Sequence, residues 1–459
     1  MLKFIDLFAG LGGFHVGLER LGMKCVFASE LNKDLRALYQ ENYGLEEKYV
    51  RGDINHVSNE EIPSHDFLCA GFPCQPFSKA GSQEGLNDKV RGNLFYEILR
   101  IVKHHKPTYL LLENVANLLK HDSQNTWRVI KAELKAAGYE VDHKILSPHQ
   151  FGVPQLRQRM FIVAVREDKW GLSCFNWPQP ESHENMSVRT VLDEGPRQAN
   201  WRDFTDREAE AVAVWQEFLD CLPPDAPLPS FPIWATEYKA NYPYVEKVPK
   251  MLTKKQLAEY RGSFGKRLKK LKGSKRLKRI PTYAQPDELF PPWKQQFIRD
   301  NRAFFKKYEK ELKPVMKKIR KLPFSWQKFE WNCKGSVRQL DQLILQFRPS
   351  GIRVKRPNYF PALVSSTRTQ VPVIGWLGRY ITASEGARLQ SLGSIKLPEN
   401  NTAAFRALGN AVNAEVVKRI AERLIDHSSP TQIAEPAPKP KRKKLYPALV
   451  QGSLALATL

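Results

Sequence analysis

The stretch LKFIDLFAGLGGFHVGLERLG, residues 2–22, decides the fold that we expect for this chain. LKFIDLF is an apolar run that predicts a strand, and it ends in the glycines of AGLGG. FHVGLERLG then predicts a helix that ends at Gly22. Glycines after a strand let the backbone turn tightly and approach a ligand, although the spacing is not the GxGxxG of dinucleotide-binding turns. Alone, the pattern is also typical of a plain structural turn.

The same alternation continues to about residue 170. It predicts a doubly wound, mostly parallel sheet of the α/β class, in which ligands bind at the carboxyl ends of the strands. The further strands are predicted at 24–30, 48–54, 66–72, 109–115 and 159–165, and the further helices at 31–44, 92–106 and 125–138.

The alternation of strand and helix patterns is lost from about residue 190, where prolines, tryptophans and basic runs dominate. We expect a first domain at 1–189 and a smaller, irregular second domain at 190–375. Residues 376–427 regain a helical pattern, and we expect them to return to the first domain and complete it. The Pro- and Lys-rich residues 428–459 predict a disordered tail.

The net charge of +24 is clustered, because residues 254–279 hold twelve Lys or Arg and one acid. A basic cluster of this kind favours nucleic acid as a partner over a merely solvated surface. The six cysteines show no zinc spacing, which predicts no structural metal, no disulfide framework and a reducing cytoplasm. We expect no signal peptide and no membrane span, since charges and glycines break the apolar runs.

Two acids follow predicted strands. Glu30 ends the second strand and suits the hydroxyls of a ribose, and Asp53 ends the third and suits an adenine amino group. Leu31 and Ile54 offer apolar walls for a ring. Taken singly, each acid is more typical of a helix N-cap. Together with the glycine turn they predict a nucleoside site.

A cysteine between prolines stands in GFPCQPFSKAG, residues 71–81. Cys74 cannot join a helix or a sheet interior there, whereas Cys25 and Cys69 lie in apolar strands and fit the core. A fixed, partly exposed thiol at a strand end is suited to nucleophilic attack.

Glu113 follows a run of leucines at another predicted strand end. Burial among such neighbours raises the pKa of a carboxyl group, so Glu113 is suited to hold a proton. QLRQR, residues 155–159, places Arg157 and Arg159 on one face of an extended segment, where they suit an anion or a carbonyl oxygen.

Taken in order, these segments resemble the DNA (cytosine-5)-methyltransferase family of the bacterial restriction–modification type. The resemblance covers nearly all of 1–170 and 376–426, and 190–375 shows no usable match, as expected for the family's variable target-recognition domain. It rests on FIDLFAGLGGFHVGLERLG, ASELN, RGDI, GFPCQPFSKAG, LLLENV, QFGVPQLRQRMFIVAVR, SEGARLQSLG and RALGNAVN.

The resemblance implies a cofactor, S-adenosylmethionine, and a substrate, cytosine in duplex DNA. Cys74 would be the nucleophile, Glu113 would contact N3 of the base and Arg159 its O2, with Arg157 the less certain partner. Pro73 and Gln75 would fix the cysteine loop, and Ser78 would begin a segment that closes over DNA. The implied cofactor site comprises Phe8, Ala9, Gly10, Gly12, Glu30, Leu31, Asp53, Ile54, Pro73, Leu94, Asn410 and Val412.

The bases around the target are expected to be read by residues 347–370, because a bidentate arginine on guanine is the usual device. Arginine also binds phosphates, so each of these arginines is a candidate for either a base contact or a phosphate contact. The candidates are Arg348, Arg353, Arg356 and Arg368, and Gln75 and Ser78 join them as DNA contacts.

Four alternatives stand beside this interpretation. A nicotinamide oxidoreductase is disfavoured by the missing GxGxxG, and it explains neither the Pro-Cys-Gln loop nor the charge. A tRNA cytosine-5 methyltransferase of the same fold carries a Cys-Phe-Thr signature, whereas here Cys174-Phe175 is followed by Asn176. A non-catalytic DNA-binding scaffold is expected to have lost Cys74 or Glu113. A solitary regulatory methyltransferase is also open. The compact layout favours the restriction–modification role, in which a cognate restriction endonuclease acts on the same site without direct contact. We expect a monomer in the bacterial cytoplasm, beside the nucleoid.

Overall fold

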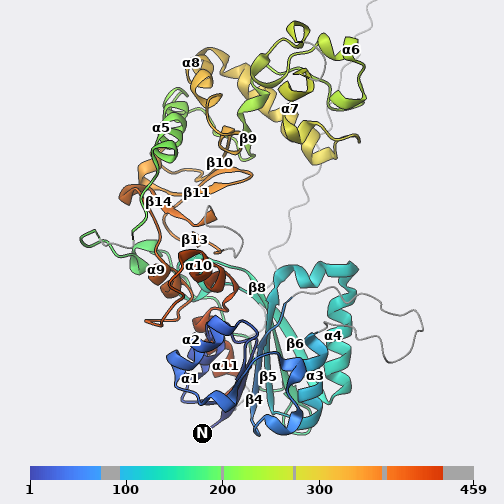
Figure 1. Cartoon of the computed structure of the whole chain (residues 1–459), viewed down its shortest axis with the longest axis vertical. Coiled ribbons are helices and arrows are strands. Elements are labelled where there is room, and N and C mark those ends of the chain that lie inside the picture. The colour runs from blue at the N-terminus through green and yellow to red at the C-terminus, as the bar shows by residue number, and fades with distance from the viewer. Residues whose placement is uncertain (74–93, 198–200, 272–274, 364–369, 427–459) are drawn as a thin grey trace, which may run out of the picture.

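The computed structural model describes residues 1–73, 94–197, 201–271, 275–363 and 370–426. Figure 1 shows a lower lobe built on one sheet and an upper lobe above it. We name residues 1–189 with the last helix the first lobe, and residues 201–380 the second lobe.

The first lobe contains the predicted α/β sheet. Its seven strands run in the order β3-β2-β1-β4-β5-β8-β6, and only β8 is antiparallel to its neighbours. The strands are β1 (Lys3–Leu7), β2 (Lys24–Ser29), β3 (Val50–Arg51), β4 (Phe67–Gly71), β5 (Tyr109–Val115), β6 (Tyr139–Leu146) and β8 (Arg159–Arg166).

Helices cover both faces of this sheet, because the strands are apolar on both sides. Phe4 of β1 packs with α1 and α11, whereas Ile5 and Leu7 pack with α3 and α4 on the other face. Figure 1 shows the same two layers. The helices are α1 (Gly13–Glu19), α2 (Lys33–Tyr43), α3 (Leu94–His105), α4 (Asn125–Ala136) and α11 (Ala414–Ile425).

Strand β6 was not predicted. Its sequence, YEVDHKIL, places charged residues among the apolar ones, and it lies at the edge of the sheet beside β8 alone. An edge strand needs fewer apolar residues than a central one, so the periodicity of buried strands does not detect it.

Helix α11 packs on the first lobe from the far end of the chain. It lies against α1, where two glycines permit close approach. A Cβ atom at Gly13 would lie 2.3 Å from the carbonyl oxygen of Val412, and one at Gly17 would lie 2.8 Å from that of Ala414. The side chains of Val412 and Val417 also lie against these glycines, so any larger residue at either position of α1 would push the two segments apart.

The second lobe holds more regular structure than its proline-rich sequence suggested. A second sheet runs in the order β15-β14-β11-β12-β10-β9, and α5 and α8 pack beside it. Its strands are β9 (Ile233–Trp234), β10 (Lys328–Asn332), β11 (Ile344–Arg348), β12 (Gly351–Lys355), β14 (Val373–Ile374) and β15 (Arg379–Tyr380). Its helices are α5 (Asp206–Asp220), α6 (Lys254–Ala258), α7 (Pro292–Lys307) and α8 (Glu309–Ile319).

The boundary between the lobes differs from the predicted one at 375/376. Strand β15 pairs with β14 across that position, so the second sheet extends to Tyr380. Helices α9 (Ala383–Leu389) and α10 (Asn401–Asn410) share the apolar cluster of the second lobe and lie at the junction of the two lobes. Among the residues after 380, α11 is the helix that packs on the large sheet.

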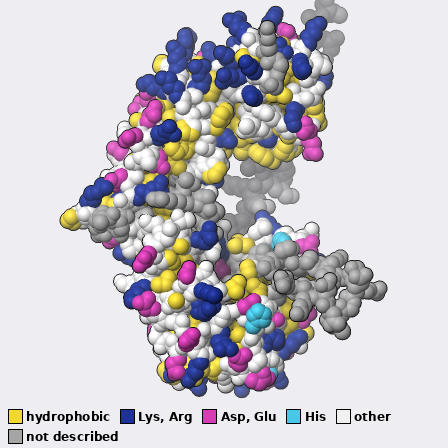
Figure 2. Space-filling view, viewed as in Figure 1, with side chains coloured by type: hydrophobic (Ala, Val, Ile, Leu, Met, Phe, Trp, Pro, Cys, Tyr) yellow, Lys and Arg dark blue, Asp and Glu magenta, His cyan; other side chains and the backbone are white. Residues whose placement is uncertain are grey.

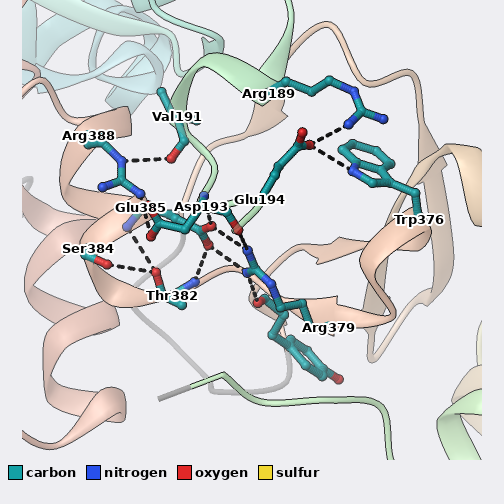
Figure 3. Close-up of polar contacts among 11 residues, drawn as sticks. Arg189, Val191, Asp193, Glu194, Trp376, Arg379, Thr382, Ser384, Glu385 and Arg388 are labelled. Carbon is teal, nitrogen blue, oxygen red and sulfur yellow. Dashed lines mark hydrogen bonds and ion pairs between the residues drawn. The ribbon is translucent and has the colours of Figure 1, made fainter. Parts of the chain in front are cut away.

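A buried ion pair fastens this junction (Figure 3). Arg379 and Glu385 are both fully buried, and their charged atoms make two contacts of 2.7 and 3.0 Å. Glu385 also accepts hydrogen bonds from the backbone N–H groups of Asp193 and Thr382. The pair thereby ties the chain that leaves the first lobe to the chain that returns to it.

We predict that Glu385→Gln lowers the free energy of unfolding by about 3–5 kcal/mol, because it leaves the Arg379 charge buried without its partner. Urea unfolding measures the loss. The matched control is Glu41→Gln, which removes an exposed ion pair with Lys396 and should cost about 0–1 kcal/mol. Similar small losses in both variants would contradict the role given to Glu385.

Candidate active site at the carboxyl ends of the strands

The glycine turn after β1 is built from left-handed backbone. Phe8, Gly10 and Gly12 have φ angles of 58°, 53° and 78°. The turn closes through a hydrogen bond from the Gly12 N–H to the Ala9 carbonyl, 2.8 Å long. A Cβ atom at Gly12 would strike the ring of Tyr43, whereas one at Gly10 would meet no atom within 4 Å. The turn is therefore packed on one side and open on the other.

Glu30 connects this turn to the end of β2. Its two carboxylate oxygens accept hydrogen bonds from the backbone N–H groups of Gly10 and Asn32, each 2.8 Å long. A carboxylate has about four acceptor sites, so Glu30 keeps capacity for hydroxyl donors of a ligand.

Asp53 lies at the end of β3 and caps a short 3-10 helix, which is the ordinary role that the sequence left open for it. Its carboxylate accepts a hydrogen bond from the Asn55 backbone N–H, and this bond lowers the pKa of Asp53. Leu31 is 71% exposed, whereas Ile54 and Leu94 pack into the core between the sheet and α3.

The end of β4 leads to the predicted nucleophile. Phe72 is buried and Pro73 is exposed; Cys74, Gln75 and Ser78 lie outside the described residues. The buried Asn114 donates a 2.9 Å hydrogen bond to the Phe72 carbonyl and so fixes the backbone two residues before Cys74. The sequence analysis quoted Asn114 within LLLENV but gave it no role, since such a contact depends on the pairing of β4 with β5.

Glu113 and Arg159 meet beside that strand end. Glu113 pairs with Gly71 across β4 and β5, and Arg159 begins the neighbouring β8. The Nε atom of Arg159 lies 3.0 Å from an Oε1 atom of Glu113 that is buried and has no aligned hydrogen bond. Burial raises the pKa of Glu113, and Arg159 offsets only part of this effect.

Arg157 does not share the face of Arg159 as the sequence predicted. Its side chain is 2% exposed, and its guanidinium donates to the main-chain carbonyls of Leu363, Gly409 and Ala411. Those donors are therefore not directed at a ligand. The segment 155–159 is held at β7 (Gln155–Leu156), which pairs with β13 (Phe360–Pro361), and this pairing turns Arg157 into the protein.

The chain after α10 returns to the same edge of the sheet. Val412 packs against Gly13 of α1, directly behind the glycine turn, and Asn410 is exposed. Asn413 caps α11 by accepting hydrogen bonds from the N–H groups of Glu415 and Val416. Residues from both ends of the chain thus meet at one site.

The predicted DNA-reading arginines lie in the second lobe. Arg348 and Arg353 share the carboxylate of Glu330, and Arg356 donates to the Ser336 hydroxyl. Arg368 lies outside the described residues. Within the described ranges, His, Cys, Asp and Glu form no group that suits a metal ion, and no helix is long and apolar enough to cross a bilayer.

Comparison with known proteins extends these observations. The family model for C-5 cytosine-specific DNA methylases matches residues 2–220. The Type II methyltransferase M.AluI of Cellulosimicrobium cellulans is 32% identical over 484 residues, which cover 91% of this chain and 91% of that protein. M.HhaI of Haemophilus parahaemolyticus is 43% identical over 179 residues, which cover 39% of this chain and 53% of that protein.

Solved structures show similarity over a larger share of the chain at lower identity. The crystal structure of Dnmt2 methyltransferase from S. pombe covers 93% of this chain and 100% of its own, with a TM-score of 0.45 and 18% identity.

The raised pKa of Glu113 gives a pH-dependent stability. The folded chain keeps this proton at pH values where the unfolded chain has released it, so the stabilisation is complete below the ordinary glutamate pKa. It is lost as pH rises through the raised pKa, by at most about 1.4 kcal/mol per pH unit. We therefore expect Glu113→Gln to lose less stability than the unmodified chain over this window.

Thermal unfolding midpoints at a series of pH values measure the difference. Glu184→Gln is the control, because Glu184 is exposed, and it should follow the unmodified chain. Parallel profiles for Glu113→Gln and the unmodified chain would refute the assignment.

Proposed function

The chain belongs to the C-5 cytosine-specific DNA methylase family, and we propose that Cys74 is the nucleophile with which it methylates carbon 5 of cytosine in duplex DNA. The methyl donor of this family is S-adenosylmethionine, and the target base is rotated out of the duplex. The assignment to this chain's own residues rests on one observation above all. The buried Glu113 carboxyl lies beside the strand end that leads into Cys74.

The residues around the glycine turn suit S-adenosylmethionine. The space over Gly10 is open, Glu30 keeps acceptor capacity for ribose hydroxyls, and the exposed Leu31 offers an apolar wall. Asp53 and Ile54 would hold the adenine, and Phe8, Ala9, Gly12, Pro73, Leu94, Asn410 and Val412 would complete the site. When bound, the cofactor supplies an electrophilic methyl group on a sulfonium.

Cytosine carbon 5 is a poor nucleophile until the ring is activated. The Cys74 thiolate forms a bond to carbon 6, and the Glu113 carboxyl gives its proton to N3, which takes up the electron pair. Carbon 5 would then be able to accept the methyl group that bound S-adenosylmethionine supplies, with S-adenosylhomocysteine left behind. Loss of the carbon-5 proton to water restores the carbon 5–carbon 6 double bond and expels the Cys74 thiolate, and the N3 proton returns to the Glu113 carboxylate. Arg159 lies beside Glu113 and would bind the O2 atom of the base. Arg157 holds the backbone of this segment instead.

The second lobe is suited to bind the DNA backbone. Residues 233–323, which we call the basic segment, contain 26 Lys and Arg and 8 Asp and Glu, a net +18 of the chain's +24. Figure 2 shows these blue side chains gathered over the upper lobe, with a hollow between it and the lower lobe. Cations at phosphates supply binding energy that offsets the few kcal/mol needed to rotate a base out of the stack.

The biological setting is also proposed. Relatives named Type II methyltransferases favour the modification role of a restriction–modification system, with an endonuclease that acts on the same DNA site without touching this chain. We propose that it works as a monomer in the cytoplasm, beside the nucleoid. A solitary regulatory enzyme and a tRNA methyltransferase are the alternatives, and the transfer experiment below separates the tRNA methyltransferase from the two DNA-modifying enzymes.

We predict that the purified chain transfers labelled methyl groups from S-adenosylmethionine to carbon 5 of cytosine in duplex DNA, and that Cys74→Ser abolishes this transfer. Cys174→Ser is the matched control and should keep full activity, since Cys174 lies in a loop after β8. Label in tRNA but not in DNA would move the chain to the RNA-modifying branch. Methyl transfer to DNA by Cys74→Ser would contradict the assignment of Cys74 as the nucleophile.

We also predict that reversing Lys269, Lys270 and Lys278 to Glu weakens binding to all duplexes alike. If each contacts a phosphate, the slope of log affinity against log salt should fall by about one per lysine. The control reverses Lys24, Lys106 and Lys135, which are exposed residues of the first lobe at or just before the amino ends of strands. A changed sequence preference in the first variant would contradict the backbone role.

A further inference from the structure

The second sheet has one polar face. Its three central strands β11, β12 and β10 place Gln346, Arg353 and Glu330 directly opposite one another in register. Residues in register point to the same side of a sheet, and Arg348, Lys328 and Lys355 alternate onto this side as well. A single row of polar side chains therefore crosses three strands.

The other face is apolar and fixed. Phe329, Ile352 and Phe347 form the neighbouring row, and all three are buried. The ring of Trp215 from α5 stacks on Phe329 at 4.6 Å between centroids. Because this packing holds the strands rigidly, the polar row on the opposite side is a preorganised surface rather than a loose set of long side chains.

Glu330 is shared by two arginines. Arg353 Nε lies 2.8 Å from its Oε2 atom, and Arg348 Nη1 lies 3.1 Å from the same atom. The side chains of Arg348, Arg353 and Glu330 are 22%, 28% and 14% exposed. In the described part of the chain, no hydrogen bond or ion pair uses the two Nη groups of Arg353. Glu330 thus binds the Nε atom of Arg353, and the two Nη groups at the outer edge of the guanidinium are left without a partner among the described residues.

Charge on this face is unbalanced. Lys328, Arg348, Arg353 and Lys355 share it with one carboxylate, Glu330. Burial lowers the pKa of Lys328 and of Lys355, and the neighbouring cations add to this effect. Cations held together at partly desolvated positions favour an anionic or acceptor-rich ligand.

The row is connected to the active site by a short piece of chain. Strand β12, which carries Arg353, leads in a few residues to β13, and β13 pairs with β7 immediately before Arg157 and Arg159. Pro361 follows Arg353 by eight positions in the chain, a span of at most about 28 Å. DNA held at Arg159 is therefore within reach of this face, over a distance of several base pairs.

We propose that Glu330 is a positioning residue that holds Arg353, with Arg348 beside it, to read a guanine near the target cytosine. The outer edge of a guanidinium carries two parallel N–H donors, which match the O6 and N7 acceptors of guanine in the major groove. A carboxylate on the inner nitrogen fixes the plane of that edge. This inference rests on the proposed methylation of duplex DNA and adds the residues that select the sequence.

The test compares the full chain with Glu330→Gln and Arg353→Lys on a pool of duplexes with randomised bases around cytosine. Each protein receives S-adenosylmethionine, and the methylated sites are sequenced. Lysine keeps the positive charge but cannot make two parallel contacts. We expect both variants to lose about tenfold to a hundredfold of their discrimination at the same guanine position. The affinity for S-adenosylmethionine should not change, because the row lies outside the cofactor site.

Glu311→Gln is the matched control, because Glu311 is an exposed acid on α8 of the same lobe, and it should keep the parent preference. A parent preference retained by both Glu330→Gln and Arg353→Lys would overturn the inference, as would an Arg353→Lys chain that loses overall rate without any change in preference, since that result marks a phosphate contact. An unmodified chain that methylates no duplex would instead refute the proposed function itself.

Discussion

The contact between α1 and α11 is the constraint on which the rest of the structure depends. Gly13 and Gly17 bring the backbone of the first helix against carbonyl groups of Val412 and Ala414. The large sheet needs α11 as part of its cover, so the chain must return to the first lobe after building the second. The exit and the return must then lie together, and Arg379 and Glu385 bind these two passages to one another.

Three carboxylates in the molecule are paired with arginine to different degrees. At the junction, Arg379 and Glu385 neutralise one another with nearly all of their hydrogen-bonding groups satisfied, which gives a rigid joint. At the carboxyl ends of the strands, Arg159 offsets only part of the rise in the pKa of Glu113 that burial causes, so this carboxyl is able to hold a proton. On the second sheet, Glu330 holds two arginines and keeps the sum positive. The three carboxylates thus differ in how completely arginine neutralises them.

The sequence was sufficient for the first lobe because its strands are buried on both faces and its turns are marked by glycine. Most strands and helices of this lobe, and the positions of Glu30, Asp53 and Glu113 at or near strand ends, could be predicted from such local signals. Strand β6 could not, since an edge strand tolerates charges. The contacts of Arg157 with Gly409 and Ala411 join segments some 250 residues apart, and no local pattern encodes them. In β10, alternation is present in KFEWN, but five residues are too few to stand out in a proline-rich region.

The position of α11 near the end of the chain also sets the order in which the lobes of a newly synthesised molecule can be completed. A ribosome that makes about 5–20 residues per second needs roughly 20–80 s to travel from Gly17 to Val417, its contact on α11. Throughout that interval the face of α1 has no cover, and the intervening lobe emerges and can fold. The first lobe is therefore completed only after the second lobe has been synthesised. A chain that terminates before residue 414 lacks the helix that covers α1, so its first lobe stays incomplete.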